Sequence, residues 1–280
     1  MLAKPLTLLL ALATTAAAQR TPLEVRPRVG DTLRMRLDQT TEMSAQRAGA
    51  PARQVTTRTT MLSRAIVESE VVDAAIVLAI TDSVDVSSTD ENARAAALAN
   101  SRQLVGKSMR LRLARDGSVT VAEPTGAVSK SVVDLASVMP ATFPRDPVAV
   151  GDTWSREMPI APAALARLLG PGSRGGVARA TFRLDSLSRQ ADFAYVSMHG
   201  TLAASTPAAA PQTALVPSPA LDGTVSGGMI VDRRRGWLSQ SRFVVDLRTL
   251  VGGRDASHAA TEFHMRVTQQ MRVFGRPPAR

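Results

Sequence analysis

Three histidines are the first residues to test for chemistry, because imidazole is the commonest metal ligand among side chains. They are His199, His258 and His264. His258 and His264 would share one face of an extended segment, but a strand rises about 3.3 Å per residue and would separate them by roughly 20 Å. Zinc needs three or four ligands at compact spacing, and the chain has no cysteine to supply one. The sequence therefore predicts no metal site and no cofactor.

Nucleophilic and phosphate-binding patterns are the second group of candidates. The serine in Gly172-Ser173 lacks the surrounding sequence of a nucleophile elbow. The glycine-rich segments 170–176 and 227–228 are not followed by the Gly-Lys-Ser/Thr of a phosphate loop. Because no set of residues forms a catalytic signature, we predict that the protein is not an enzyme, and we rank a hydrolase third among the functions considered.

Carboxylates gather around one expected hairpin, at Glu68, Glu70, Asp73, Asp82 and Asp85. Two carboxylates act as acid and base only at a defined separation, which a sequence does not give. Solvated strand faces and turns account for all of these charges. We therefore interpret the group as surface carboxylates.

Basic residues are the remaining candidates for binding. The net charge is +10, and lysine occurs only at positions 4, 107 and 130, so the charge comes mostly from arginine. On an exported protein this charge favours an anionic envelope component, such as a lipid headgroup. Arg233-Arg234-Arg235 is interpreted as a solvated hairpin turn, with anion binding as the alternative. Nucleic acid is not an expected partner, because the aromatic residues needed for base stacking make up only 3% of the chain.

Residues 1–18 have the organisation of a secretory signal peptide. Lys4 precedes an apolar run from Leu6 to Ala13, and small alanines then fit a cleavage site before Gln19. The run is too short to span a membrane, and no later stretch approaches the roughly 20 apolar residues that a span requires. We therefore expect an exported protein, periplasmic or extracellular, without a membrane span.

The elements that would position any site are organised around a repeated tetrapeptide. Val150-Gly151-Asp152-Thr153 repeats Val29-Gly30-Asp31-Thr32. Glycine supplies a positive φ and aspartate accepts a bond from a nearby backbone N–H, so each copy predicts a turn that leads into a strand. The repeat indicates two related halves, which we assign to residues 19–147 and 148–280.

Alternation of apolar and polar residues predicts β-strands in both halves. In order, the expected strands are 32–43, 56–69, 75–87, 108–113, 119–121, 177–188, 193–202, 229–232, 237–247 and 260–274. Landmarks of the two halves correspond at an offset of about 120 residues, which indicates an internal duplication. Residues 44–54 are expected to form a loop, and residues 90–103 a loop or a short helix.

A helical period replaces this alternation between residues 125 and 139. Apolar residues recur there at threes and fours, at Val128, Val132, Leu135 and Met139. Such a stripe must be covered, and the concave face of the first-half sheet is the expected cover. The fold class is therefore predicted as mainly β (α+β), with two similar curved antiparallel sheet units and a few packed helices.

A family resemblance rests on the approach to the second tetrapeptide and on the hairpin from Gly223 to Trp237. The most specific part is the stretch Phe143-Pro144-x-x-Pro147-Val148-x-Val150-Gly151-Asp152-Thr153-Trp154. With this stretch, the hairpin, the signal peptide and a Met-rich last strand, the chain resembles an uncharacterised family of secreted bacterial β-rich proteins. A looser likeness is to periplasmic lipoprotein carriers and mycobacterial lipid-binding lipoproteins, in which a curled antiparallel sheet and helices enclose an apolar cavity. The family resemblance implies no catalytic residue and no known ligand, and the looser likeness implies an apolar cavity. The chain departs from many such lipoproteins in having no lipid-anchor cysteine.

The predicted ligand site follows from this architecture. Methionine repacks around irregular guests, and most methionines fall on the apolar side of their strands. Trp154 and Trp237 either fill the core or line the mouth of a cavity. The predicted ligand-contacting residues are Met35, Met109, Leu111, Val132, Trp154 and Trp237. We predict a non-catalytic exported protein that binds an apolar or lipid-like ligand; the alternative is an envelope structural or interaction protein with a filled core.

Overall fold

Long strands dominate the structure, because apolar and polar residues alternate through most of the chain. The computed structural model describes residues 20–47, 51–123, 142–160, 175–204, 220–251 and 261–274. They contain β1 (Thr32–Arg47), β2 (Arg53–Val71), β3 (Ala74–Ser88), α1 (Glu91–Arg102), β4 (Ser108–Ala114), β5 (Val119–Glu123), β6 (Thr153–Ile160), β7 (Gly176–Leu187), β8 (Phe193–Ala204), β9 (Ala220–Asp232), β10 (Trp237–Val251) and β11 (Thr261–Phe274). The mainly β fold class is confirmed.

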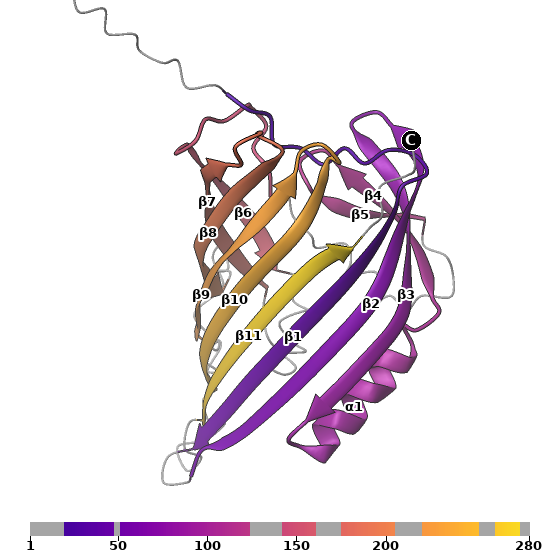
Figure 1. The fold of residues 1–280 in the computed structure, drawn as a ribbon. Helices are drawn as coiled ribbons and strands as arrows, with labels where there is room; N and C mark the ends of the chain where they lie inside the picture. The colour runs from indigo at the N-terminus through magenta and orange to yellow at the C-terminus, as the bar shows by residue number, and fades with distance from the viewer. Residues whose placement is uncertain are drawn as a thin grey trace, which may run out of the picture.

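All of these strands belong to one 11-stranded antiparallel sheet, in the order β5-β4-β3-β2-β1-β11-β10-β9-β8-β7-β6. In its middle the first strand, β1, pairs with the last strand, β11, from Arg34 opposite Phe274 to Arg47 opposite Thr261 (Figure 1). β5 and β6, which follow each other along the chain, are the two outermost strands of this order. The predicted halves therefore join in one continuous curved sheet, and their definition as two similar units stays a prediction.

The observed strands extend beyond the predicted ends where their residues are polar or are glycines. Residues 44–47 and 53–54 of the predicted loop are strand, because β1 continues to Arg47 and β2 starts at Arg53. A β ladder satisfies backbone N–H and C=O groups whatever the side chains are, so pairing continues beyond the apolar alternation. β9 begins at Ala220, well before the expected start at Met229, because its glycines conceal the alternation.

The segment 90–103, expected as a loop or a short helix, forms α1, which lies along the part of β3 that β4 does not pair (Figure 1). Asp90 caps this helix, because its carboxylate accepts the backbone N–H of Ala93 at 2.9 Å. The hydrogen bond from Ala93 and then the one from Arg53 lower the pKa of Asp90. The carboxylate therefore carries its charge at the helix N-terminus, where the helix dipole favours an anion.

Both Gly-Asp turns have the same backbone geometry. Gly30 and Gly151 have φ values of 89° and 95°, which residues with a side chain rarely adopt. In each copy the aspartate accepts a hydrogen bond from the backbone N–H three residues earlier, at 3.0 and 2.9 Å. The glycine N–H of the first copy donates to Val67, and that of the second to Leu184. The tetrapeptide thus builds the same turn twice and ties each copy to the second strand after it, β2 in the first case and β7 in the second.

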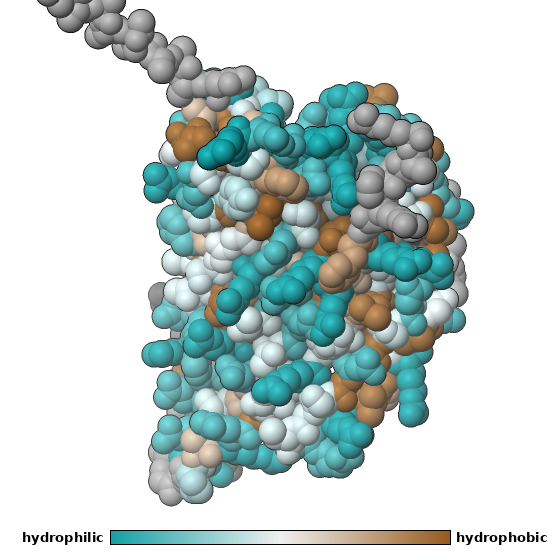
Figure 2. All heavy atoms as spheres, viewed as in Figure 1, coloured by the Kyte–Doolittle hydropathy of each residue, from teal (hydrophilic) through white to brown (hydrophobic). Residues whose placement is uncertain are grey.

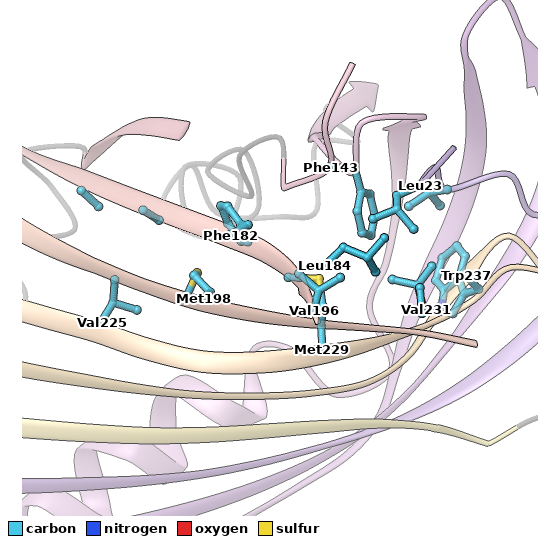
Figure 3. Packing of buried hydrophobic residues seen from close by; sticks show 14 of the residues in the cluster. Leu23, Phe143, Phe182, Leu184, Val196, Met198, Val225, Met229, Val231 and Trp237 are labelled. Carbon is cyan, nitrogen blue, oxygen red and sulfur yellow. The ribbon is translucent and has the colours of Figure 1, made fainter. Parts of the chain in front are cut away.

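The sheet has two unlike faces, which we call inner and outer. The inner face carries the main core, including Val67, Phe182, Leu184 and Val231, which are at most 1% exposed. Figure 3 shows part of this core, with Phe143 and Leu23 packed over the sheet near Leu184. On the outer face hydrophilic side chains predominate over β1, β2, β10 and β11 (Figure 2). Burying one face while solvating the other is the usual arrangement of antiparallel sheets.

Two predicted features lie outside the described residues, namely the signal peptide at 1–18 and the helix at 125–139 with Val132. They stay predictions. Among the residues that the structure describes, no helix has both the length and the apolar character needed to cross a membrane.

Candidate functional site

Methionines line the inner face of the sheet. Every methionine in the described ranges occupies an inner position, and these are Met35, Met43, Met61, Met109, Met158, Met198, Met229, Met265 and Met271. The strand register sets Met43 opposite Met265, and it sets Leu37 opposite Met61 on one side and Met271 on the other. The inner face is therefore lined by flexible, polarizable side chains that adapt to irregular shapes.

Burial along the inner face differs between the two parts of the sheet. On β7 and β9, Phe182, Leu184 and Val231 are fully buried. On β1, β2 and β4, inner residues such as Met35, Met61 and Met109 are only half-buried. Apolar surface therefore stays partly accessible in the first part of the sheet, and this surface is the candidate binding site.

The predicted ligand-contacting residues are distributed over this face. Met35 lies on β1, and Met109 and Leu111 lie on β4, all at half-buried inner positions. Trp154 lies on β6, near the other end of the strand order. The structure thus brings these residues to one face without gathering them into one cluster, because two strands lie between β4 and β1, and eight lie between β4 and β6.

Trp154 packs against the core and is bonded to the backbone. Its ring stacks on Phe182, with a centroid distance of 5.7 Å and an interplanar angle of 9°. Its indole N–H donates to the carbonyl of Thr142 at 2.8 Å. Two positions further, Arg156 donates to the carbonyl of Phe143. Sequence reasoning did not single out Arg156, although a charged residue between Trp154 and Met158 on the apolar side of a strand was a readable signal.

Trp237 is part of the core beside Val231 (Figure 3). It is 9% exposed, and its indole nitrogen is buried without a hydrogen-bond partner in the described part of the chain. The preceding residue, Gly236, accepts a hydrogen bond from the backbone N–H of Arg26 at 2.7 Å. The N-terminal segment therefore covers this hairpin turn, and Trp237 fills the core under it.

The arginines of that turn interact with groups of the protein itself. Arg233 donates to the carbonyl of Ala191 at 2.5 Å, and Arg234 lies 3.6 Å from the Asp192 carboxylate. Arg235 lies 3.6 Å from Asp232, which is buried. The bonds of Arg233 and Arg234 tie the β9–β10 turn to the β7–β8 turn, whereas the contact of Arg235 with Asp232 lies within its own hairpin.

Charges on the outer face are paired in a similar way. Arg36 and Asp38 approach to 2.8 Å, and the hydrogen bond from Arg36 is the main cause that lowers the pKa of Asp38. On opposite sides of β3, the Glu68 carboxylate on β2 lies 2.8 Å from Arg110 on β4. Four of the five predicted carboxylates are therefore arginine partners, because Glu68 is joined by Asp82 with Arg64 at 3.0 Å, Asp73 with Arg115 at 3.6 Å and Glu70 with Arg26 at 4.0 Å.

The described histidines lie on the outer face. His264 bonds to the Asp246 carboxylate at 2.9 Å across β10 and β11, and His199 is exposed on β8. His258 lies outside the described residues. Within the described ranges, no three residues among His, Asp and Glu are grouped so that they could hold a metal ion.

A hollow of about 390 Å³ opens on the outer face over β7 to β10. Its floor is Gly228, where β9 has no side chain, and Tyr195 and Arg242 stand beside it. Ser197 donates to the Asp185 carboxylate at 3.0 Å on its rim. None of the predicted ligand-contacting residues in the described ranges lines this hollow. The hollow is therefore a different site from the one predicted on the inner face.

Comparisons with known proteins add information on the fold. No protein-family model and no curated protein sequence matches the chain. Among solved structures, one of lipovitellin, described for its lipid–protein interactions, matches with a TM-score of 0.51 and 9% identity, over 91% of this chain and 26% of that chain. This chain thus spans about a quarter of that lipovitellin chain. The match shows a similar β-rich fold.

Two bacterial outer-membrane proteins match less well. One is an outer-membrane channel from Pseudomonas putida, with a TM-score of 0.25 and 12% identity, over 89% of this chain and 97% of that chain. The other is the outer-membrane protein OprG from Pseudomonas aeruginosa, with a TM-score of 0.20 and 10% identity, over 90% of this chain and 100% of that chain.

Proposed function

We propose that this protein is a non-catalytic exported binding protein whose inner sheet face holds an apolar or amphiphilic, lipid-like ligand. The observation that carries the proposal is the accessible, methionine-rich surface of β1, β2 and β4. Met35, Met61 and Met109 occupy inner positions there and stay half-buried. Covering apolar surface is favourable by about 25 cal/mol per Å², so an acyl chain lying on this surface would be stabilised.

Polar side chains on the same face suit an amphiphile better than a hydrocarbon. Gln39 on β1 lies opposite Gln269 on β11, both at inner positions and half-buried. The amide of Gln39 donates to Thr41 at 3.3 Å. Polar groups inside an apolar surface need hydrogen-bond partners, and an amphiphile can supply them. The similarity of fold to lipovitellin, a protein described for its lipid–protein interactions, also supports a lipid-like ligand.

The alternative function is that of an envelope structural or interaction protein with a filled core. The close packing of Phe182, Leu184 and Val231 favours it, because these three inner side chains have no accessible surface. Binding measurements with a probe that fills the accessible part separate the two functions.

Titration with a fluorescent acyl probe tests the binding proposal. The folded protein is expected to bind the probe saturably with a Kd in the micromolar range, about −8 kcal/mol. Leu111→Trp places a large ring on the inner face of β4 and is expected to weaken binding about tenfold. Leu62→Trp is the matched control, because Leu62 lies on the outer face of β2 and is 43% exposed. If Leu111→Trp binds the probe as tightly as Leu62→Trp, the filled-core function is favoured instead.

Export is the second part of the proposal. Lys4, the apolar run from Leu6 to Ala13 and the alanines before Gln19 support removal of residues 1–18. After expression in a bacterium with a secretory pathway, N-terminal sequencing of the exported protein is expected to start at Gln19. An exported chain that retains Met1 would contradict this prediction.

A further inference from the structure

The inner face of the sheet from β6 to β11 carries one charged residue. Arg156 lies between Trp154 and Met158 on β6 and pairs with Ala180 on β7. Following the register from strand to strand, every other inner position in the described parts of β6 to β11 is uncharged. Arg156 is half-buried, and a charge that is partly removed from water needs hydrogen-bond partners or a counter-ion to compensate it.

Among the described residues, Arg156 forms one hydrogen bond, which leaves most of its donors without a described partner. A guanidinium has five N–H donors, and one nitrogen, Nη2, donates to the carbonyl of Phe143. The Nε atom is buried and has no hydrogen-bond partner in the part of the chain that the structure describes. In the described ranges Arg156 forms no ion pair with a carboxylate, whereas Arg179 on the outer face of β7 pairs with Glu157 at 3.1 Å. The charge of Arg156 is therefore not neutralised by a described carboxylate.

Neighbouring strands offer Arg156 no further partner. Ala180 lies opposite it on β7, and Gly200 follows opposite Ala180 on β8. Neither residue has a polar side chain. Phe182 and Met198, at the adjacent inner positions of these two strands, are buried. On β6 itself, Trp154 and Met158 flank Arg156 and are half-buried. Arg156 thus combines N–H donors that have no partner among the described residues with the half-buried apolar side chains of its own strand.

We propose that Arg156 binds the anionic headgroup of an acidic amphiphile, a carboxylate or a phosphate, while its acyl chain lies along the inner face. This inference rests on the proposed function and names its ligand class. The planar guanidinium fork matches carboxylate and phosphate oxygens, and hydrogen bonds between charged groups are about twice as strong as neutral ones. The bond to Phe143 holds the guanidinium in place, because Phe143 is 1% exposed in the core.

Paired probes test this assignment. A fluorescent long-chain fatty acid and its methyl ester are titrated into the wild-type protein, Arg156→Gln and Arg156→Lys. Arg156→Gln is expected to weaken binding of the acid about tenfold and to leave binding of the ester within about twofold. Arg156→Lys keeps the charge and is expected to retain part of the preference for the acid. Arg179→Gln is the matched control, because it removes one arginine from the outer face of the adjacent strand.

The outcomes separate this inference from the proposed function. If neither probe binds the wild-type protein, the proposed function fails and the headgroup site fails with it. If both probes bind and Arg156→Gln leaves the acid unaffected, or weakens acid and ester equally, Arg156 has only a structural role. Inorganic phosphate without an acyl chain is expected not to displace the fatty acid; displacement at similar concentration would mean that the site binds free anions, and would overturn the assignment to an amphiphile.

Discussion

Phe182→Ala is expected to lower the free energy of unfolding by about 4 kcal/mol. The Phe182 side chain is 0% exposed on the inner face of β7 and stacks on Trp154 at 5.7 Å. Its removal leaves a cavity in a region where neighbouring strands fix the backbone, so collapse around the site is limited. For a chain of this size the loss corresponds to a fall in Tm of roughly 10 °C. Thermal and urea unfolding, followed by circular dichroism, measure both quantities.

Phe193→Ala is the matched control for this change. Phe193 is at the start of β8 and is 37% exposed, so its truncation is expected to cost less than about 1 kcal/mol. The near-ultraviolet signal of Trp154 should change in Phe182→Ala and not in Phe193→Ala. Equal losses of stability in the two variants would mean that the stacked pair is not part of the core.

Gly227→Ala is expected to destabilise the protein by about 3 kcal/mol, the second large effect. A Cβ atom at Gly227 would lie 2.2 Å from the backbone carbonyl oxygen of Arg242 and 2.6 Å from the ring of Phe243. Gly227 faces Phe243 across the β9–β10 ladder, so the clash can be relieved only by moving one strand away from the other. The expected fall in Tm is roughly 5 to 10 °C.

Gly228→Ala, at the adjacent position, provides the comparison. Its nearest neighbour would be the carbonyl oxygen of Val196 at 3.2 Å, which a small shift accommodates. Alanine also has a better strand propensity than glycine, so we expect a change below about 1 kcal/mol. Similar Tm values for the two variants would contradict the close contact between β9 and β10 at Gly227.

Many local features of the fold were predictable because they depend on neighbours in sequence. Alternation located most strands, since successive side chains of a strand point to opposite faces. The Gly-Asp-Thr repeat predicted two turns, and Gly30 and Gly151 both have the positive φ that such turns require. The positions of the apolar residues in this alternation also predicted that Met35, Met109 and Leu111 lie on one face of the sheet.

Long-range pairing was outside the reach of these patterns. Nothing in the local sequence of β1 and β11 specifies that they pair, because an antiparallel ladder uses backbone groups common to all residues except proline. That pairing joins both halves in one sheet and makes β5 and β6 its outermost strands. Likewise, the glycines of β9 appeared as a break in alternation, whereas they permit close contact with β10.

For the candidate site, the sequence by itself determined which residues face inward, and the tertiary structure decided what they contact there. Alternation fixes the side of a strand on which Trp154, Arg156 and Met158 lie. Only the folded chain brings Phe143 and Thr142 over β6, so that Arg156 and Trp154 donate to their carbonyls. The physical reason is that burial and hydrogen bonding depend on segments distant in sequence, which become neighbours only when the sheet is complete.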